Sequence, residues 1–580
     1  MTDTGAMTDT GTMTDTGTMA IVKVGDKEKT MPATPPESSL LITGARVYTA
    51  DPRHPWAEAI AIRGNRIVYV GAEDRAREQA GSGAVRAHVP GGLAIPGLNE
   101  SHVHMTLGSH ALTILNLDGI ATLSALQERL RAYAAAHPDK PWIEGYGLAY
   151  EPLTGLDRPE RLALDDAVSD RPLFIRAMDY HSAWANTAAL RLAGVERGAD
   201  VPRPNEVVVD ASGLATGMLK ERQALDRVDR LIAAPTQEQS DDMLHQAMRY
   251  MNGLGITSVQ NMDGDPERLL QYERLRERGA LTLRAYHYLN IRTPAQRERL
   301  PEFAELTRRY TDTWNRTRGI KLFIDGVVEA KTALLLEPYI DGSDDTGVPD
   351  MDLAAYHEIV VEADRLGMDV ATHAIGDRGV RLTLDAYEAA QRANGGRRDR
   401  RHRVEHIEVG HPADIPRFAR LGVTASMQPY HAAPGEDPRY TPWTALVGPD
   451  RGPYAFPWRG LLEAGAPLAF GSDWPVVTPD VRVGLHTALT RTNLMCEPRG
   501  GWQTQQSVTL AQALDAYTRG AAYAEAQDDV KGMLRAEMLA DVTIFAQDLF
   551  TLPPDDILSV EIAATVVDGQ IVHRSAASEA

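Results

Sequence analysis

Two histidines follow an apolar run in the stretch LAIPGLNESHVHM, residues 93–105, with one valine between them. Side chains two residues apart in an extended segment project to the same side, so His102 and His104 can reach one metal ion together. Neutral imidazole is a common ligand of Zn²⁺ and similar divalent ions. Taken alone the pair is weak support for a metal site, because histidines are also found in cores and on surfaces.

Groups of the same chemistry lie near the ends of short apolar segments later in the chain. They are Lys321 and Asp325 in IKLFIDG, His373 in MDVATHA, His406 in HRVEHIE and Asp473 in PLAFGSD. Imidazole and carboxylate together suit a divalent ion, and an incompletely filled shell leaves room for water. We therefore predict a centre for one or two divalent ions, namely Zn²⁺, held by His102, His104, His373, His406 and Asp473.

The chemistry expected of such a centre is hydrolysis. A divalent ion lowers the pKa of the water that it binds from about 16 to about 7 and polarises the carbonyl under attack. Asp473 is predicted to be catalytic, accepting a proton from this water and delivering it to the leaving nitrogen; the alternative is a plain ligand or a strand-end cap. Lys321 offers no ligand as an ammonium group, whereas carboxylation by CO₂ would give it two oxygens that bridge two ions. The alternative is a core-lining lysine paired with Asp325.

Eight short strands alternating with helical stretches are expected to position these residues. This pattern is typical of an α/β protein with a parallel (β/α)₈ TIM-like barrel, in which the chemistry lies at the carboxyl ends of the strands. Residues 120–250 exceed what one strand–helix unit needs, so we expect an insertion there, after the first strand. The predicted strands are residues 94–98, 256–262, 281–289, 320–326, 368–374, 402–408, 423–429 and 467–473.

The two ends of the chain have a different hydrophobic pattern from the middle. Residues 40–92 and 533–580 contain short alternating segments typical of hairpins, and we expect them to pair into one composite β-sandwich domain. The (β/α)₈ barrel is then residues 93–532. Residues 1–39, with their repeated MTDTG, are expected to be a disordered low-complexity tail.

Composition and net charge limit the classes of molecule that the protein is expected to bind. The formal net charge of −20 argues against nucleic acid, and no apolar run approaches the roughly 18 residues of a membrane span. Cys496 is the single cysteine, so no intrachain disulfide can form and a cytoplasmic location is the simplest expectation. The expected partner is a small-molecule substrate, and a homodimer stays open.

Five motifs, in chain order, resemble the metal-site motifs of the amidohydrolase superfamily: PGLNESHVH, IKLFIDG, ATHAIGD, VEHIE and FGSDWPV. MDYHSAWANTAAL, SMQPYHA and the closing YTRGAAYAEAQDDVKGML are similar to its amidohydrolase family 3 branch. The resemblance covers residues 40–575. It implies a carboxylated Lys321 between two ions, one held by His102, His104 and Asp473 and the other by His373 and His406.

The same motifs suggest residues around the substrate. His181 is predicted as an electrophile on the scissile carbonyl, and the predicted substrate contacts are Trp184, Asn186, Asp325, Gln428 and His431; for Trp184 the alternative is core packing. The chain departs from the family pattern at Asn99 and Glu100, where Asp and a small residue usually precede H-x-H. It also departs at Glu329 and Lys331, which could alter substrate choice.

We therefore predict a metal-dependent hydrolase that cleaves a C–N bond of an amide or N-formyl group. The alternatives are a cyclic-amide, lactone or deaminating hydrolase of the same superfamily, since the same ions attack all of these carbons. A non-catalytic metal-binding regulatory protein is a further alternative, against which the intact H-x-H and Asp473 argue.

Overall fold

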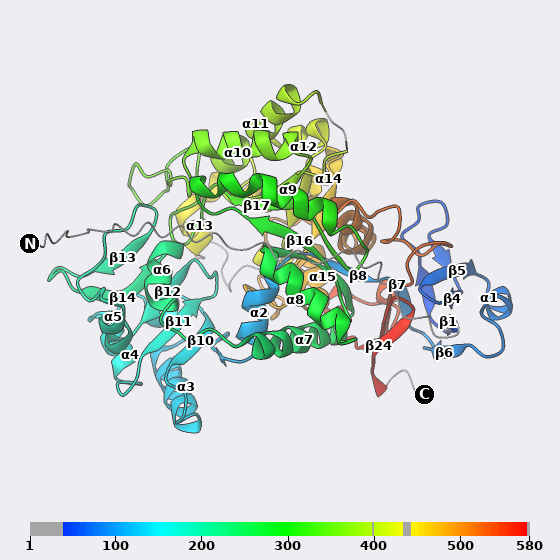
Figure 1. Ribbon diagram of the computed structural model, residues 1–580, viewed down its shortest axis with the longest axis horizontal. Helices are drawn as coiled ribbons and strands as arrows, with labels where there is room; N and C mark the ends of the chain where they lie inside the picture. Colours follow the sequence, from blue (N-terminus) through cyan, green and yellow to red (C-terminus); the bar gives the residue numbers. More distant parts are fainter. Residues whose placement is uncertain (1–38, 397–398, 433–441, 577–580) are drawn as a thin grey trace, which may run out of the picture. The chain divides into compact units, whose positions relative to one another are not determined.

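The computed structural model describes residues 39–396, 399–432 and 442–576, so the first 38 residues of the predicted tail lie outside the described residues. Eight neighbouring parallel strands form one sheet, and the predicted (β/α)₈ barrel is confirmed (Figure 1). In order, the strands are β8 (Leu98–Val103), β15 (Ile256–Gly264), β16 (Arg284–Asn290), β17 (Asn315–Phe323), β18 (Asp369–Ala374), β19 (Arg403–His406), β20 (Thr424–Met427) and β21 (Leu468–Phe470).

The barrel is joined just beyond its last strand. The backbone N–H of Asp473 donates to the carbonyl of His102 at 2.8 Å, and His104 donates to the carbonyl of Trp474 at 2.8 Å. Gly471 makes this approach possible, because a Cβ there would lie 2.5 Å from the backbone nitrogen of His102. The seam between β8 and β21 therefore runs through the residues predicted to bind metal.

Amphipathic helices separate the strands. The helix α10 (Leu353–Arg365) begins after Asp352, whose carboxylate accepts the N–H of Ala355, and buries Tyr356 and Ile359 among its apolar residues. α11 (Asp377–Ala393) ends before Gly395, which has φ +81°, a left-handed conformation that glycine readily adopts just after a helix. The other helices between barrel strands include α7 (Gln237–Gly253), α8 (Pro266–Glu277), α9 (Leu300–Arg309), α12 (Ile415–Leu421) and α14 (Trp458–Glu463).

The prediction that residues 94–98 form the first barrel strand is wrong, because the next segment of the chain forms it. β7 (Leu93–Pro96) pairs instead with β22 (Val542–Phe545), and the chain steps at Gly97 into β8. The apolar run does not distinguish the two sheets, while the polar sequence of β8 obscures a strand that is buried along its whole length. Its carboxylate and amide each have a partner from a distant part of the chain: Glu100 accepts the N–H of Ser472, and Asn99 donates to Glu525.

Strands from both ends of the chain share one sheet, and Figure 1 shows blue β7 near red β24. Its order is β24 (Gln570–Arg574), β23 (Ile562–Val567), β22, β7, β2 (Arg46–Tyr48) and β3 (Trp56–Ala57). A second sheet has the order β5 (Arg66–Gly71), β4 (Ala59–Arg63), β1 (Ser39–Thr43) and β6 (Val85–His88). The division of the chain into domains at residues 92 and 533 stays a prediction.

A further six-stranded sheet lies between β8 and β15 in the chain, over the range predicted as an insertion. Its helices include α5 (Thr187–Ala193) and α6 (Arg222–Asp229). The strands, in sheet order, are β13 (Glu206–Val209), β14 (Ala215–Lys220), β12 (Ser182–Ala185), β11 (Leu173–Ala177), β10 (Ile143–Leu148) and β9 (Leu115–Asn116).

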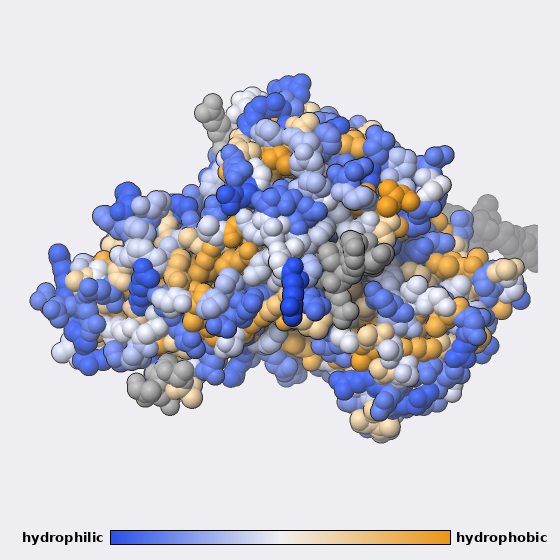
Figure 2. Space-filling model, turned by 180° about the vertical axis from the view of Figure 1, so that it is seen from behind, coloured by the Kyte–Doolittle hydropathy of each residue, from blue (hydrophilic) through white to orange (hydrophobic). Residues whose placement is uncertain are grey.

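The surface agrees with the acidic, polar composition. Figure 2 shows hydrophilic residues over most of one face, with apolar residues gathered in separate patches. Among the described residues, no helix has both the length and the apolar character needed to cross a membrane.

Candidate metal centre

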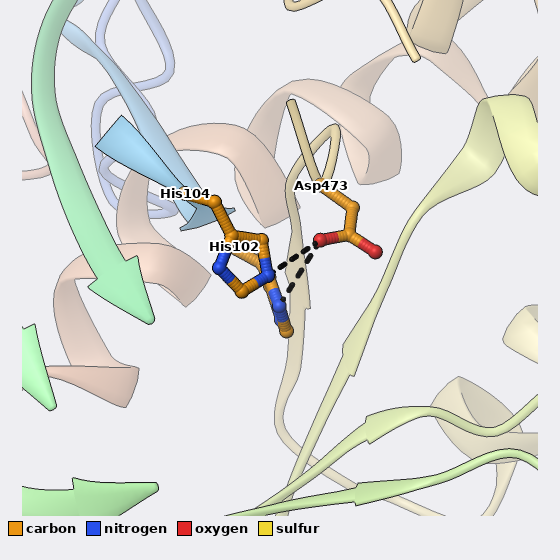
Figure 3. Close-up of side chains that lie close together, drawn as sticks. All are labelled: His102, His104 and Asp473. Atoms are coloured by element: carbon orange, nitrogen blue, oxygen red, sulfur yellow. Dashed lines mark ion pairs between the residues drawn. The ribbon is translucent and has the colours of Figure 1, made fainter. Parts of the chain in front are cut away.

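His102, His104 and Asp473 meet at the barrel seam (Figure 3). The Nε2 atoms of His102 and His104 lie 3.3 and 3.1 Å from Oδ1 of Asp473. His102 comes from the end of β8, His104 stands directly before α2 (Met105–Ala111), and Asp473 follows β21. The neighbouring imidazoles hold the pKa of Asp473 well below its usual range, although burial alone would raise it. Three ligand atoms of the types that divalent ions prefer therefore converge from opposite sides of the seam.

Glu405 fixes the orientation of His102. Its Oε2 lies 2.7 Å from Nδ1 of His102, and its other oxygen accepts a bond from Arg403 at 2.5 Å. Burial, and then the charge of Lys321, lower the pKa of His102 to about 4, so the ring is neutral at neutral pH. A proton on Nδ1 donated to Glu405 leaves the Nε2 lone pair directed toward Asp473.

A second group shares Asp473. Nδ1 of His406 lies 2.9 Å from Oε1 of Gln428, while Nε2 of His431 lies 3.9 Å from Oδ2 of Asp473. His406, His431 and Asp473 each offer a ligand atom within 4.8 Å of the others. His406 and Asp473 have φ of +77° and +65°, a left-handed backbone conformation that is strained for such residues and concentrates at functional sites.

His373 and Lys321 line the same end of the barrel. The ring centroid of His373 is 4.5 Å from that of His406, and its Nε2 lies 3.1 Å from the carbonyl oxygen of Gly326. Lys321 is fully buried, and within the described residues its Nζ has no hydrogen-bond partner. Burial lowers the pKa of Lys321 to about 7. A buried amine without a hydrogen-bond partner destabilises the fold unless another group binds to it.

The donor set fits a divalent ion. Buried polar atoms normally have hydrogen bonds, so unpaired ones that converge on one place need an explanation. Imidazole nitrogens and a carboxylate oxygen are the ligands that zinc takes. Within the described residues, the buried atoms without a hydrogen-bond partner at this site are His102 Nε2, His104 Nδ1, Lys321 Nζ, His406 Nε2, His431 Nε2 and Asp473 Oδ1.

His181 reaches the site from the sheet between β8 and β15. Its ring centroid lies 5.3 Å from that of His373, and its Nδ1 lies 2.9 Å from Oε2 of Glu221. Burial by itself would lower the pKa of His181, but the charges of Glu221 and Asp179 raise it to about 9. His181 is therefore a protonated donor at neutral pH, beside imidazoles that are neutral.

A cavity of about 1350 Å³ opens onto these groups. Asp473 and three of the predicted metal-binding histidines line it together with His181, and so do the substrate candidates Asp325 and His431. The carboxylate of Asp325 accepts the backbone N–H groups of Leu334, Ile375 and Gly376, so it also fixes the loops beside His373. The histidines that line the cavity are His104, His181, His373, His406 and His431.

Three of the predicted substrate contacts are not among the residues that line the cavity. Trp184 is 2% exposed and packs in a core beside the ring of Tyr150, which is the alternative role considered for it. Asn186 caps α5, and its side chain is bonded entirely to backbone groups. Gln428 accepts from, and so orients, His406. Residue type alone does not reveal that these side chains satisfy internal partners.

Two carboxylates beside the site were missed from the sequence. Glu405 directly precedes His406, and period-two alternation with Arg403 is a signal that could have placed both inside the barrel. Glu221 is far from His181 in the chain and gave no local signal. Of the departures from the family pattern, Glu329 lines the cavity, whereas Lys331 contacts Asp341 at an exposed position.

Comparisons with known proteins agree with this geometry. A model described as "Amidohydrolase family" matches residues 90–573. The chain is 29% identical to the protein LONG AFTER FAR-RED 3 of Arabidopsis thaliana, covering 93% of each chain. It is 25% identical to an N-substituted formamide deformylase of Arthrobacter pascens, covering 93% of this chain and 99% of that protein.

A solved structure has the same architecture. It is an uncharacterized metal-dependent hydrolase from Pyrococcus furiosus, with a TM-score of 0.67 and 26% sequence identity. The match covers 88% of this chain and 99% of that one. The strand order, the barrel seam and the convergence of histidines on Asp473 thus occur in a chain that is similar to hydrolases over nearly its whole length.

Proposed function

The chain belongs to the amidohydrolase family, as the resemblance predicted, and from this premise we propose that it is a metal-dependent hydrolase that cleaves the C–N bond of an amide or N-formyl substrate. The observation that carries the proposal is the convergence of buried, unpaired imidazole nitrogens on Asp473 at the carboxyl ends of the barrel strands. The names of similar proteins, a formamide deformylase and a metal-dependent hydrolase, support it.

His102, His104, His373, His406 and Asp473 would hold the metal, with zinc as the proposed ion. When bound there, such an ion supplies an activated water and polarises the substrate carbonyl. Glu405 and Gln428 act before any substrate arrives, because they hold His102 and His406 in fixed orientations.

Asp473 is proposed to move the proton. Its carboxylate lies at the cavity wall and is ionised at neutral pH, so it can take a proton from the attacking water and pass it to the leaving nitrogen. His181, which lines the same cavity and lies beside His373, is proposed to donate a hydrogen bond to the carbonyl oxygen as charge develops there.

Lys321 is proposed to be carboxylated on Nζ. The amine is fully buried beside His102 and His373, and it has no hydrogen-bond partner among the described residues. A carbamate, formed from the neutral amine and CO₂ with loss of a proton, would replace this unpaired group by an anion that offers two oxygen ligands. His431, which shares Asp473 with His406, is a further proposed contact of metal or substrate.

The test is elemental analysis of the purified protein combined with turnover of N-formyl amines, linear amides, lactams and lactones. We expect zinc at one or two equivalents, and release of formate or carboxylate with the free amine. Zinc below about half an equivalent, not restored by added metal, would overturn the metal assignment. Turnover of lactones alone, or release of ammonia alone, would overturn the proposed bond.

A further inference from the structure

Arg292 stands on the cavity wall directly after β16, at the same end of the barrel as the metal-centre residues. Its guanidinium carbon lies 3.4 Å from the ring centroid of Phe323. Within the described residues, its side chain has no hydrogen-bond or ion-pair partner. A cation thus faces the cavity with its donors unused.

Other arginines of this chain show the contrast. Arg284, Arg400 and Arg403, which are buried, each have a carboxylate partner at 2.5–2.9 Å. Arg176 and Arg222, which line the same cavity, pair with Asp229 and Asp226. Arg292 lies apart from this pattern, although a partly desolvated guanidinium without a partner is costly.

The stacking fixes where the donors can point. A guanidinium lying flat on an aromatic ring keeps its N–H groups in the plane parallel to that ring. Phe323 also stacks against His373, with ring centroids 5.3 Å apart and an interplanar angle of 29°. The phenyl ring of Phe323 therefore lies between Arg292 and the metal-centre histidine His373. A small molecule can contact Arg292 at one end and the metal centre at the other.

We propose that Arg292 is the anchor of a carboxylate-binding subsite, so that the substrate is an amide carrying a carboxylate a few bonds from the scissile carbonyl, such as an N-acyl amino acid. This inference rests on the proposed function. The planar fork of arginine binds both oxygens of a carboxylate at once, and such a charged pair is strong where water is scarce. Burial, and then the charge of nearby Arg222, lower the pKa of Arg292 to about 9, although the charges of Asp350, Asp263 and Asp226 oppose this shift.

Asp350, followed by Asp263 and Asp226, attracts Arg292, and within the described residues none of the three makes an ion pair with it. Asp350 is the strongest of these competing anions. It also lines the cavity. Burial, followed by the charge of Glu221, raises the pKa of Asp350 to about 6, so its charge is already opposed by its surroundings. A substrate carboxylate is therefore the better partner for Arg292.

The experiment compares matched substrates in the metal-loaded protein. N-formyl-β-alanine carries the carboxylate, and N-formylpropylamine has the same length without it. We expect the wild type to prefer the first, and Arg292→Gln to lower the ratio of the two kcat/KM values by about tenfold or more, mainly through KM. Arg292→Lys should recover part of the ratio. Arg176→Gln, which removes an arginine that lines the same cavity and is paired with Asp229, should leave the ratio within about threefold.

Glutarate binding, measured by calorimetry, distinguishes failure of the proposed subsite from failure of the proposed function. Loss of glutarate binding in Arg292→Gln, with none of the amides hydrolysed by the wild type, would keep the subsite and overturn the proposed function. Hydrolysis of both substrates without preference, with equal glutarate binding by the wild type and Arg292→Gln, would overturn the subsite and keep the function. An equal fall for both substrates in Arg292→Gln would assign Arg292 a structural role and also overturn the subsite.

Discussion

His102 and Asp473 are joined twice: the backbone N–H of Asp473 donates to the carbonyl of His102 at 2.8 Å, and their side chains meet at 3.3 Å. One pair of residues therefore links the first barrel strand to the segment after the last and also forms the centre of the candidate site. Changes in either side chain should affect chemistry and metal binding together.

Asp473→Asn should lower kcat by about two to four orders of magnitude, because an amide cannot accept the proton that the carboxylate takes from water. The measurement is steady-state kinetics on the best amide substrate, with metal content determined on the same sample. Asp344→Asn, at an exposed loop position, is the control and should behave as the wild type. Full turnover by Asp473→Asn would remove Asp473 from proton transfer.

Glu405→Gln should weaken zinc binding by about 10- to 100-fold, because the carboxylate that orients His102 and neutralises Arg403 is lost. Competition with a chromogenic chelator measures this directly and does not depend on turnover. Glu463→Gln removes an exposed carboxylate paired with Arg459 and serves as the matched control. Equal zinc affinity in both variants would contradict the role of Glu405.

Lys321→Ala should lose nearly all activity, and short carboxylic acids such as formate or propionate should restore part of it by supplying the missing oxygens. Lys321→Arg keeps the positive charge but cannot form the carbamate, so added acid should not rescue it. We also expect the metal-free wild type to regain activity faster when zinc is added with bicarbonate. Rapid recovery in solutions stripped of CO₂ would show that Lys321 acts unmodified.

His181 should set the alkaline limit of the reaction. Its pKa is raised to about 9, so the cation is present below that pH and is lost as pH rises through it. If the protonated ring assists the carbonyl, kcat should fall above pH 9 in the wild type, and His181→Gln should lower kcat by about 10²-fold with a flat alkaline limb. Metal content should stay unchanged; its loss in His181→Gln would reassign His181 to metal binding.

Protonated His181 also stabilises the fold, and this stabilisation falls with rising pH just as its effect on kcat does. Its folded pKa lies above its ordinary value of about 6.5, so the stabilisation from Glu221 is fully present below that value and disappears as pH rises through about 9. Thermal melts of the wild type and His181→Gln should therefore converge at alkaline pH. A constant difference between the two melting temperatures from pH 6 to pH 10 would contradict this.

The barrel could be predicted from the sequence because its apolar segments are short, alternate with amphipathic helices and end in residues suited to one chemistry. His102, His104, His373, His406 and Asp473 were predicted in this way as metal ligands, and they lie together at one end of the barrel. β8 was missed because the hydrogen-bond partners of its buried polar residues, Ser472 and Glu525, are far away in the chain. Trp184 and Asn186, predicted as substrate contacts, do not line the cavity, for a related reason: a polar or aromatic side chain looks alike in sequence whether it faces a ligand or its own core. Arg292 follows a strand without any motif, and its significance comes from the partner that it lacks.

The single step at Gly97 ties distant parts of the molecule to the reaction. β7 pairs with β22, and a Cβ at Gly97 would collide with Thr257 and Asp541. The backbone is therefore tightly constrained between the sheet shared by the two termini and β8, which carries His102. A deletion or loosening of the carboxyl-terminal strands would thus be transmitted along the backbone to an imidazole a few residues away. Catalytic failure could then arise from damage at a terminus that touches neither substrate nor ion.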